Sequence, residues 1–530
     1  MIRNHYISTA LSWYKTVLIS YYGVKSAKIL AVLPVAGKSH YILASTLMRA
    51  LAERGHDVTV ISCWGEKNPP KNGTYRDIVM TGAMEELQRH LSSKDSNMFT
   101  RKGVNVFVDV FFATMIIYRF NELTMKHENV QKFIRSGEKF DVVIVEQFAN
   151  DALKALSTHF GAPLISLSAM GASYWTNPLV GNPSPPSYIP HFRSDFSTSM
   201  TFYERLVNSL LYAFHDLLYH FIVFPQQNQL MKKYIPNAPE HLNDVLYNSS
   251  IVLLNSHPSI NQPVPHVPNM IEIGGYHLKR PKKLPQDLQE FLDSAKDGVI
   301  YFSMGSNLKS AVLPSDKCDA ILKTFAKLKQ KILWKWEEDD LPGKPPNVKT
   351  AKWLPQQELL AHPNVRLFIT HGGLLSTTET IYHGVPILAI PIFGDQKINA
   401  RSAVTSGYGV YLAFDKLNEE TLTNSINQIL NNKKYKENVQ MRSRLFHDRL
   451  VSPLDTAIYW VEYVIRHRGA PHLRVTALDL PWYKYLLLDV IAVIALVLLS
   501  SLLIFCYIVK LIGRLVCSKK TKTSKKAKKE

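Results

Sequence analysis

Short apolar runs alternate with stretches of helical periodicity along much of the chain, which is the pattern of strands that alternate with helices. Residues 28–34 and 57–62 are apolar runs bounded by turn residues, and residues 42–54 between them have helical periodicity. This order predicts a strand–helix–strand unit. Residues 140–146 and 162–166 are further apolar runs of the kind that parallel sheets bury.

A second series of alternations begins after a proline-rich stretch, residues 263–285. The chain is therefore predicted to be an α/β protein with two Rossmann-like domains in tandem. In open α/β sheets ligands bind at the carboxyl ends of the strands, so two such domains that face each other would form a cleft. The second series predicts strands at 298–303, 331–336, 365–370 and 386–392, and helices at 317–329 and 374–383.

Two segments of the first half have no clear strand–helix pattern. Residues 175–190 contain five prolines and are expected to form a loop over the site. Residues 200–235 are rich in Tyr, Phe and Leu with helical periodicity. We expect plain core packing for this segment, with an acceptor-pocket wall or a membrane-facing surface as the alternatives.

The C-terminal region contains a membrane signal. Residues 490–509 carry no charge over the length that a helix needs to cross a bilayer, so residues 486–509 are predicted to span a membrane rather than to form a buried core helix. Trp482, Tyr483 and Tyr485 precede the span, and a basic tail, residues 510–530, follows it. The positive-inside rule then predicts a single-pass type I protein with a cytosolic tail and a lumenal body.

The two ends carry further targeting features. Residues 1–26 are a weak signal peptide, because Lys15 interrupts the apolar stretch, and an uncleaved leader stays open. Lys526 and Lys528 form a Lys-x-Lys-x-x ending that resembles dilysine signals, which predicts an endoplasmic reticulum membrane protein. Asn72 and Asn248 begin glycosylation sequons, which matter only in a lumenal body.

Charge and cysteine content exclude two classes of function. The formal net charge is +19, but nine basic residues and one acidic residue lie in the tail, which leaves a modest surplus on the body. No zinc-finger spacing or basic helix with heptads accompanies it, so no nucleic-acid partner is expected. Four scattered cysteines are too few for a disulfide framework or a cysteine-based metal site.

The densest motif runs from residue 353 to residue 396 and contains Trp353-Leu354-Pro-Gln356, His371-Gly-Gly373, Ser376, Glu379 and Asp395-Gln396. The block resembles the signature of the UDP-glycosyltransferases. It looks most like the animal membrane-bound branch that includes the UDP-glucuronosyltransferases, and its residues 372–379, Gly-Gly-Leu-Leu-Ser-Thr-Thr-Glu, are similar to insect members. The resemblance implies the GT-B fold, with an acceptor-binding domain (27–262), a linker (263–285) and a UDP-sugar-binding domain (286–480).

The residues around His371 have the chemistry of an anion site. His371 ends a predicted strand, and Gly373 precedes a helix whose free N–H groups and positive dipole end favour a diphosphate. Ser376 and Thr377 in the first turn can donate hydroxyl hydrogen bonds. Gly305 and Ser306, after another strand, could supply a second loop to the same phosphates.

The resemblance assigns roles to the other motif positions. It places His371 and Ser376 on the diphosphate, Glu379 on the ribose hydroxyls and Trp353 on the uracil ring. It places Asp395 and Gln396 on the sugar hydroxyls. Taken alone, Trp353 and Glu379 would be interpreted as a buried aromatic residue and a helix-surface carboxylate.

His40 follows the first strand at the position of the family's catalytic base, so the resemblance predicts that it is catalytic rather than an ordinary helix N-terminal residue. Gly37-Lys-Ser is not a phosphate-binding P-loop, because the required earlier glycine is Val32. A histidine base needs a partner that fixes its tautomer. The family has an Asp where this chain has Glu146, and Asp151 is the competing candidate; we favour Glu146.

The expected reaction follows from these assignments. His40 removes the proton of an acceptor hydroxyl, the oxygen attacks the anomeric carbon of a UDP-sugar, and the configuration inverts. No cofactor or metal is expected, because the chain lacks the Asp-x-Asp of metal-dependent glycosyltransferases. A non-catalytic lumenal binder of lipophilic ligands is the alternative from another class, whereas a glycosidase would explain neither the diphosphate seat nor His40.

The sugar and the acceptor are less well defined. Vertebrate members of the family tend to place a basic residue in a Pro-x-Pro segment where this chain has Val264, which favours UDP-glucose over UDP-glucuronate, although His266 lies nearby. The resemblance implies a small lipophilic acceptor that bears a hydroxyl, as in detoxification or conjugation. A homo- or hetero-oligomer stays open.

Overall fold

The computed structural model describes residues 26–86, 99, 105–306 and 308–526, with side chains up to residue 515. Residues 1–25 of the predicted signal peptide and the last four residues, which include Lys528, lie outside this range. The chain divides into two compact units, Met1–Arg474 and Val475–Glu530, and each is described by itself. We call the first unit the body.

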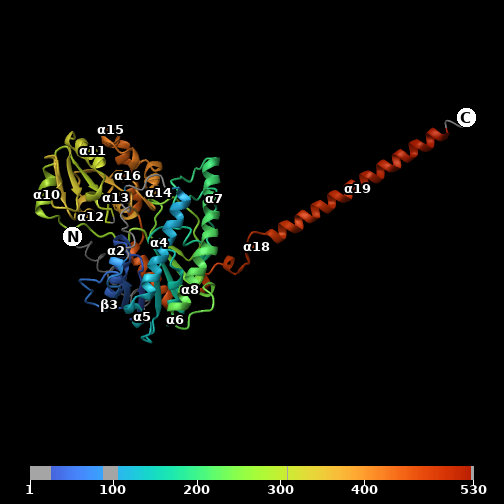
Figure 1. The fold of residues 1–530 in the computed structure, drawn as a ribbon, viewed down its shortest axis with the longest axis horizontal. Helices are drawn as coiled ribbons and strands as arrows, with labels where there is room; N and C mark the ends of the chain where they lie inside the picture. The colour runs from blue at the N-terminus through green and yellow to red at the C-terminus, as the bar shows by residue number, and fades with distance from the viewer. Residues whose placement is uncertain (1–25, 87–98, 100–104, 307, 527–530) are drawn as a thin grey trace, which may run out of the picture. The chain divides into compact units, whose positions relative to one another are not determined.

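The first half of the body, which contains α2, α4 and α7 (Figure 1), is built on a seven-stranded parallel sheet with the order β3-β2-β1-β4-β5-β6-β7. Alternate residues of its strands face opposite layers, as the two-residue period of a strand requires. Ile29 and Ala31 pack with α2, whereas Leu30 and Val32 pack with α5 and α6. In chain order this half contains β1 (Lys28–Val32), α2 (Lys38–Glu53), β2 (Asp57–Ser62), β3 (Thr74–Val79), α4 (Val106–Lys126), α5 (Glu128–Ile134), β4 (Val142–Glu146), η1 (Asp151–Lys154), α6 (Ala155–Phe160), β5 (Leu164–Ser168), η2 (Pro178–Val180), α7 (Phe202–Leu218), η3 (Tyr219–Val223), α8 (Phe224–Tyr234), α9 (Asn243–Leu246), β6 (Ser249–Leu254) and β7 (Met270–Glu272).

The second half is built on a six-stranded parallel sheet with the order β10-β9-β8-β11-β12-β13. Its core contains the aromatic residues Tyr301, Phe302, Trp334 and Phe368 from the central strands. The two parallel sheets confirm the predicted pair of Rossmann-like folds. In chain order this half contains α10 (Gln286–Asp293), β8 (Val299–Ser303), η4 (Ser310–Val312), α11 (Ser315–Ala326), β9 (Lys331–Lys335), β10 (Val348–Ala351), α12 (Gln356–Leu360), β11 (Val365–Thr370), α13 (Leu374–His383), β12 (Ile387–Ala389), α14 (Gln396–Thr405), β13 (Gly409–Tyr411), η5 (Phe414–Lys416), α15 (Glu419–Leu430), α16 (Lys433–His447), α17 (Pro453–Arg466) and η6 (Pro471–Leu473).

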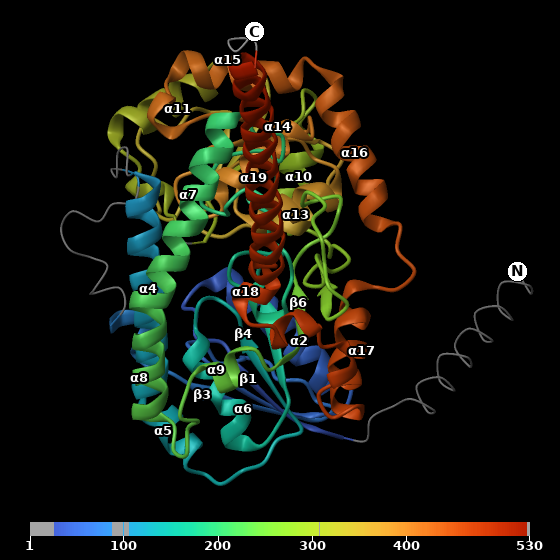
Figure 2. The same cartoon turned by 90° about the vertical axis from the view of Figure 1, so that its right-hand side faces the viewer.

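Two elements lie on the other side of the domain boundaries that we expected. The strand β7 falls inside the expected linker, 263–285, and pairs with β6 of the first sheet. Helix α17, which we assigned to the second domain, packs on α2 of the first half through Ala457 and Val461 (Figure 2). The physical reason is apolar burial, because one side of the first sheet needs α17 to cover it.

Residues 200–235 differ from the core packing that we predicted. Helix α7 continues through the π-helical turn η3 into α8, and it buries Leu211, His215 and Leu218. Several of its large apolar side chains are nevertheless exposed, among them Phe202 and Leu217. By length and composition, the segment 202–234 is also apolar enough to cross a membrane, although about a quarter of its most apolar part is buried.

The second unit contains η7 (Thr476–Asp479), α18 (Trp482–Tyr485) and α19 (Leu488–Lys526). Figure 1 shows α19 as one continuous red helix. Its part from Leu488 to Leu515 is long and apolar enough to span a membrane, and the most apolar stretch of this part is not buried against other residues. The helix therefore begins close to the predicted start of the span, residue 486, and continues beyond the predicted end, residue 509.

Candidate active site

His40 and Glu146 form the closest pair of ionisable groups predicted for the site. His40 lies in the first turn of α2, and Glu146 is the last residue of β4. The Nδ1 atom of His40 lies 2.5 Å from Oε1 of Glu146. A carboxylate only accepts, so Nδ1 carries the proton and donates it, which leaves Nε2 with a free lone pair.

The surroundings of His40 raise its pKa. Burial lowers it, but the charge and the hydrogen bond of Glu146, together with the charge of Asp395, more than reverse this effect. Asp395 belongs to the second half of the body, so residues from both halves act on this imidazole. The ring of Phe148 meets His40 edge-on, with the ring centroids 5.0 Å apart.

Asp151 makes a different set of contacts. Its Oδ1 lies 2.9 Å from the ammonium group of Lys154, a fully buried residue of the same helical turn. Its Oδ2 accepts a hydrogen bond from the hydroxyl of Tyr219 at 2.9 Å. The structure therefore brings Glu146, and not Asp151, within hydrogen-bond distance of His40.

The imidazole of His371 lies between two glycines. A Cβ atom on Gly305 would come within 2.5 Å of Cε1 of His371, and one on Gly373 within 2.5 Å of Nε2. Gly305 also has a φ of +85°, which favours glycine. Burial, with the nearby charge of Lys335, lowers the pKa of His371 to about 4, so the ring is neutral at physiological pH.

The first turn of α13 presents backbone N–H groups together with Ser376. No side chain caps this helix at Gly373, so its first N–H groups stay available to an anion. Gln356 donates hydrogen bonds to Ser376 and to Glu379. Burial raises the pKa of Glu379 to about 7, and the hydrogen bonds from Gln356 and Gln357 oppose this rise. The result is a buried carboxylate among amide donors, suited to accept from hydroxyl groups.

Two neighbouring motif residues lie in different environments. The indole of Trp353 is 65% exposed, and the ammonium group of Lys335 lies 5.9 Å from its ring centroid. The exposed face of this indole is open to a planar ligand. Leu354 is buried in the core of the second half, so only its backbone is available to a ligand.

Asp395 and Gln396 begin α14. Gln396 accepts hydrogen bonds from the backbone N–H groups of Ile392 and Phe393, which fixes the loop before the helix. Asp395 accepts from the side chain of Asn399 at 2.8 Å. Burial raises the pKa of Asp395, and Asn399, His40 and Arg193 act in the opposite direction.

Two cationic residues at the site, Lys335 and Arg193, were not predicted from the sequence. Lys335 ends β9, is buried, and donates a hydrogen bond to the carbonyl of Gly305 at 2.9 Å. Lys335 could have been recognised as a charged residue at the end of an otherwise apolar predicted strand. Arg193 comes from the first half, and its Nη1 would lie 3.7 Å from a Cβ atom on Gly394. No motif marks Arg193.

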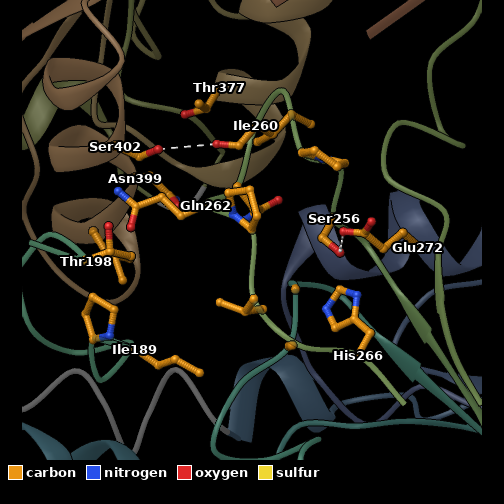
Figure 3. Close-up of a pocket in the computed structure, with 18 of the residues that line it drawn as sticks. Ile189, Thr198, Ser256, Ile260, Gln262, His266, Glu272, Thr377, Asn399 and Ser402 are labelled. Atoms are coloured by element: carbon orange, nitrogen blue, oxygen red, sulfur yellow. Dashed lines mark hydrogen bonds between the residues drawn. The ribbon is translucent and has the colours of Figure 1, made fainter. Parts of the chain in front are cut away.

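A pocket of about 200 Å³ lies at the junction of the two halves (Figure 3). Its lining includes Thr377, Val264 and His266, but not His40, His371 or Asp395. The hydroxyl of Thr377 donates to the carbonyl of Gly373. Thr377, unlike Ser376, therefore lies on the wall of this pocket, as does Asn399, the side chain that donates to Asp395.

The remaining predicted positions are a loop residue and the two sequons. Ser306 follows Gly305 in the turn after β8 and is exposed, as are Asn72 and Asn248. Within the described part of the chain, no group of three or more His, Cys, Asp or Glu side chains is placed to hold a metal ion.

Comparisons with known proteins show the family to which the chain belongs. Residues 27–527 match the family model described as "UDP-glucoronosyl and UDP-glucosyl transferase". The chain is 38% identical to UDP-glycosyltransferase UGT5 of Dactylopius coccus, over 93% of each chain. It is 32% identical to UDP-glucuronosyltransferase 2B9 of Macaca fascicularis, over 86% of this chain and 87% of the relative.

Solved structures support the fold. The calicheamicin glycosyltransferase CalG4 superimposes with a TM-score of 0.53 at 16% identity, over 84% of this chain and all of that chain. A UDP-glucosyltransferase from Polygonum tinctorium gives 0.54 at 16% identity, over 84% of this chain and 99% of that chain. The body therefore has the GT-B fold, and the chain belongs to the UDP-glucuronosyl and UDP-glucosyl transferase family and is a glycosyltransferase.

Proposed function

We propose that the protein transfers a hexose, with glucose favoured, from a UDP-sugar to a hydroxyl group of small lipophilic molecules, with inversion and without a metal. The hydrogen bond of 2.5 Å between His40 and Glu146 carries this proposal. It leaves Nε2 of His40 as the base that removes the acceptor proton. Phe148 and Trp175, whose rings lie 4.7 Å apart, would form an aromatic wall beside the acceptor.

The donor residues have complementary tasks. Trp353 stacks on uracil, Glu379 accepts from the ribose hydroxyls, and Asp395 with Gln396 holds the sugar. The charge of the departing UDP would be stabilised by the N-terminus of α13, Ser376 and neutral His371. Lys335, which donates to both the Gly305 carbonyl and Glu337, adds a positively charged group next to the Gly305 loop.

The test is a transfer assay on membranes that contain the protein. We expect UDP release and formation of a glycoside, detected by mass, when UDP-glucose and a panel of phenols are supplied. The assay is run with and without a chelator, and the same turnover is expected in both. Absence of UDP release from every donor would contradict transfer, and activity that Mg²⁺ or Mn²⁺ restores after chelation would contradict the metal-free reaction.

Glu146→Gln is expected to lower turnover about 100-fold or more, because a neutral amide stabilises the imidazolium poorly. Glu146 raises the pKa of His40, so its removal lowers that pKa. The base is active when neutral, and the acid limb of the kcat/KM profile should therefore move to lower pH. Asp151→Asn is the matched control. When activity is normalised to the amount of folded protein, the acid limb of its kcat/KM profile should lie at the same pH as in the unchanged protein. An unmoved limb in Glu146→Gln would remove the partner role.

Glucose is favoured over glucuronate because, among the described residues, the two cations found at the site already have acidic partners, and Glu337 lies 2.8 Å from Lys335. Arg193 lies close to the sugar position, but Asp109 and Asp395 already share its charge, with 3.4 Å between Nε of Arg193 and Oδ2 of Asp109. Val264 is apolar, and both Val264 and His266 line the pocket of Figure 3, whose lining does not include Asp395. A buried carboxylate without a paired charge costs several kcal/mol. At equal concentrations of the two donors we expect glucoside as the main product, and preferential glucuronide formation would contradict this.

We place the protein in the endoplasmic reticulum membrane, with the body lumenal and the tail cytosolic. The apolar helix Leu488–Leu515 and the basic residues after it support this orientation, as do the exposed sequons at Asn72 and Asn248. Protease added to sealed microsomes should remove the tail alone. Digestion of the body under these conditions would reverse the topology.

A further inference from the structure

Helix α7 exposes a second apolar stripe on the side that faces away from the core. At 3.6 residues per turn, the stripe spans an arc of about 100°, roughly opposite the buried Asn208 and His215. Arg205 and Asp216, both exposed, lie along one edge of it. The exposed apolar side chains of the stripe, on α7 and η3, are Phe202, Tyr203, Leu206, Leu210, Leu217 and Phe221.

Helix α4 adds to this surface. Figures 1 and 2 both show α4 beside α7, and the rings of Phe107 and Phe214 join the two helices with their centroids 5.3 Å apart. Val108, Phe111 and Phe112 of α4 are exposed as well. We call these three residues and the α7 stripe the outer apolar face.

The outer apolar face contains the most exposed aromatic side chains of the described body. Phe221 is 76% exposed and Phe202 is 74% exposed. Scattered apolar residues are normal on a protein surface, whereas large apolar side chains gathered on adjacent helices indicate an interaction site. A helix with an apolar stripe bordered by charged residues is typical of a helix that lies in the plane of a membrane surface.

The end of the body fits this interpretation. Arg474, its last residue, donates a hydrogen bond to the carbonyl of Tyr247 at 2.5 Å. Tyr247 packs in one cluster with Tyr219 and Phe224. The chain thus leaves the body at the same end of α7 where Phe221 is exposed.

The connection to the membrane span is also long enough. Residues 475–487 include the helical turns η7 and α18, and with these turns kept they reach about 30 Å. A stripe that lies in the plane of the bilayer surface does not need a connection as long as itself. The connection has only to reach from Arg474 to that surface.

We propose that the outer apolar face docks on the surface of the bilayer that α19 spans, with Phe202, Leu210 and Phe221 inserted among the acyl chains near the headgroups. The inference rests on the proposed membrane anchoring. It deepens the proposed function, because α4 and α7 also carry Ile117 and Tyr212 of the aromatic cluster that contains Phe148. Docking would place that cluster next to the phase in which lipophilic acceptors dissolve.

The experiment uses the full chain with its four cysteines replaced by serine, and with single cysteines introduced by Leu210→Cys, Phe221→Cys, Leu502→Cys or Glu420→Cys. Each variant is labelled with bimane and reconstituted in phosphatidylcholine vesicles whose acyl chains carry nitroxide quenchers. Leu502 lies in the span and reports insertion of α19, whereas Glu420 is an exposed residue of α15. An unchanged thermal unfolding midpoint shows that each variant is folded.

Quenching of about twofold or more is expected at Leu210→Cys and Phe221→Cys, as at Leu502→Cys, with little at Glu420→Cys. Quenching at Leu502→Cys alone would overturn the docking inference and leave the anchor intact. Absence of quenching at Leu502→Cys would contradict the proposed anchor. A blue shift at Leu210→Cys without quenching would show that protein, such as a second copy of this chain, covers the face, and would also overturn the inference.

Discussion

His40→Ala is expected to lower turnover about 10²–10⁴-fold, the usual contribution of a general base. The affinity for UDP should stay nearly unchanged, because His40 lies in α2 of the first half, whereas the residues that would hold the nucleotide lie in the second half. Single-turnover assays and calorimetric titration with UDP measure the two quantities separately. The predicted signature is a large loss of kcat with little change in the dissociation constant of UDP.

The exposed His241, replaced by alanine, is the matched control for a histidine that is distant from the site, and it should keep full turnover. Full activity of His40→Ala would remove the central assignment. A parallel loss of UDP affinity would instead indicate that the substitution disturbs the junction of the two halves.

Asp151→Asn should destabilise the fold, by about 3–5 kcal/mol, since it leaves a buried ammonium group without its counter-charge. Lys154 is completely buried, and burial already lowers its pKa against the opposing effect of Asp151. Without Asp151 this pKa falls further below its unfolded value. The unfolded chain then binds more protons, so the loss should become smaller as the pH rises. The thermal unfolding midpoint in detergent should drop by a few degrees or more at pH 7.

The double variant Asp151→Asn with Lys154→Met is the control for this pair. Removing both charges is often neutral when the replacement packs well, so most of the lost stability should return. A midpoint that stays low in the double variant would show that Asp151 stabilises the fold through Tyr219 and Gln147 rather than through Lys154.

The central strands could be predicted from the sequence because they are buried on both faces and are therefore apolar throughout. Strands β1, β4, β8 and β11 each have four or more buried residues in succession. The edge strand β3 is only partly buried and carries polar residues, so it gave no such signal. Strand β7 has three residues and was hidden in a proline-rich stretch.

The residues of the site likewise include some that could be predicted from the sequence and some that could not. Residues that act through the backbone leave a sequence pattern, such as His371-Gly-Gly373 before a helix. Residues that reach the site from a distant segment leave none, and Arg193 is the example, because its position depends on how the two halves meet. The choice between Glu146 and Asp151 also needed the structure, because Glu146 ends β4 and Asp151 follows only five residues later. Only the contacts show that Asp151 pairs with Lys154 instead of His40.

The return of α17 to the first half has a consequence for the order in which the protein folds during synthesis. Glu462 of α17 contacts His56 at 3.4 Å and Arg54 at 3.6 Å, and Ile458 and Val464 cover apolar residues of α2. The ribosome makes these residues only after both sheets have been translated. The first half therefore cannot complete its core, and the apolar side of α2 stays exposed until α17 has left the ribosome. A chaperone would bind the chain at this stage.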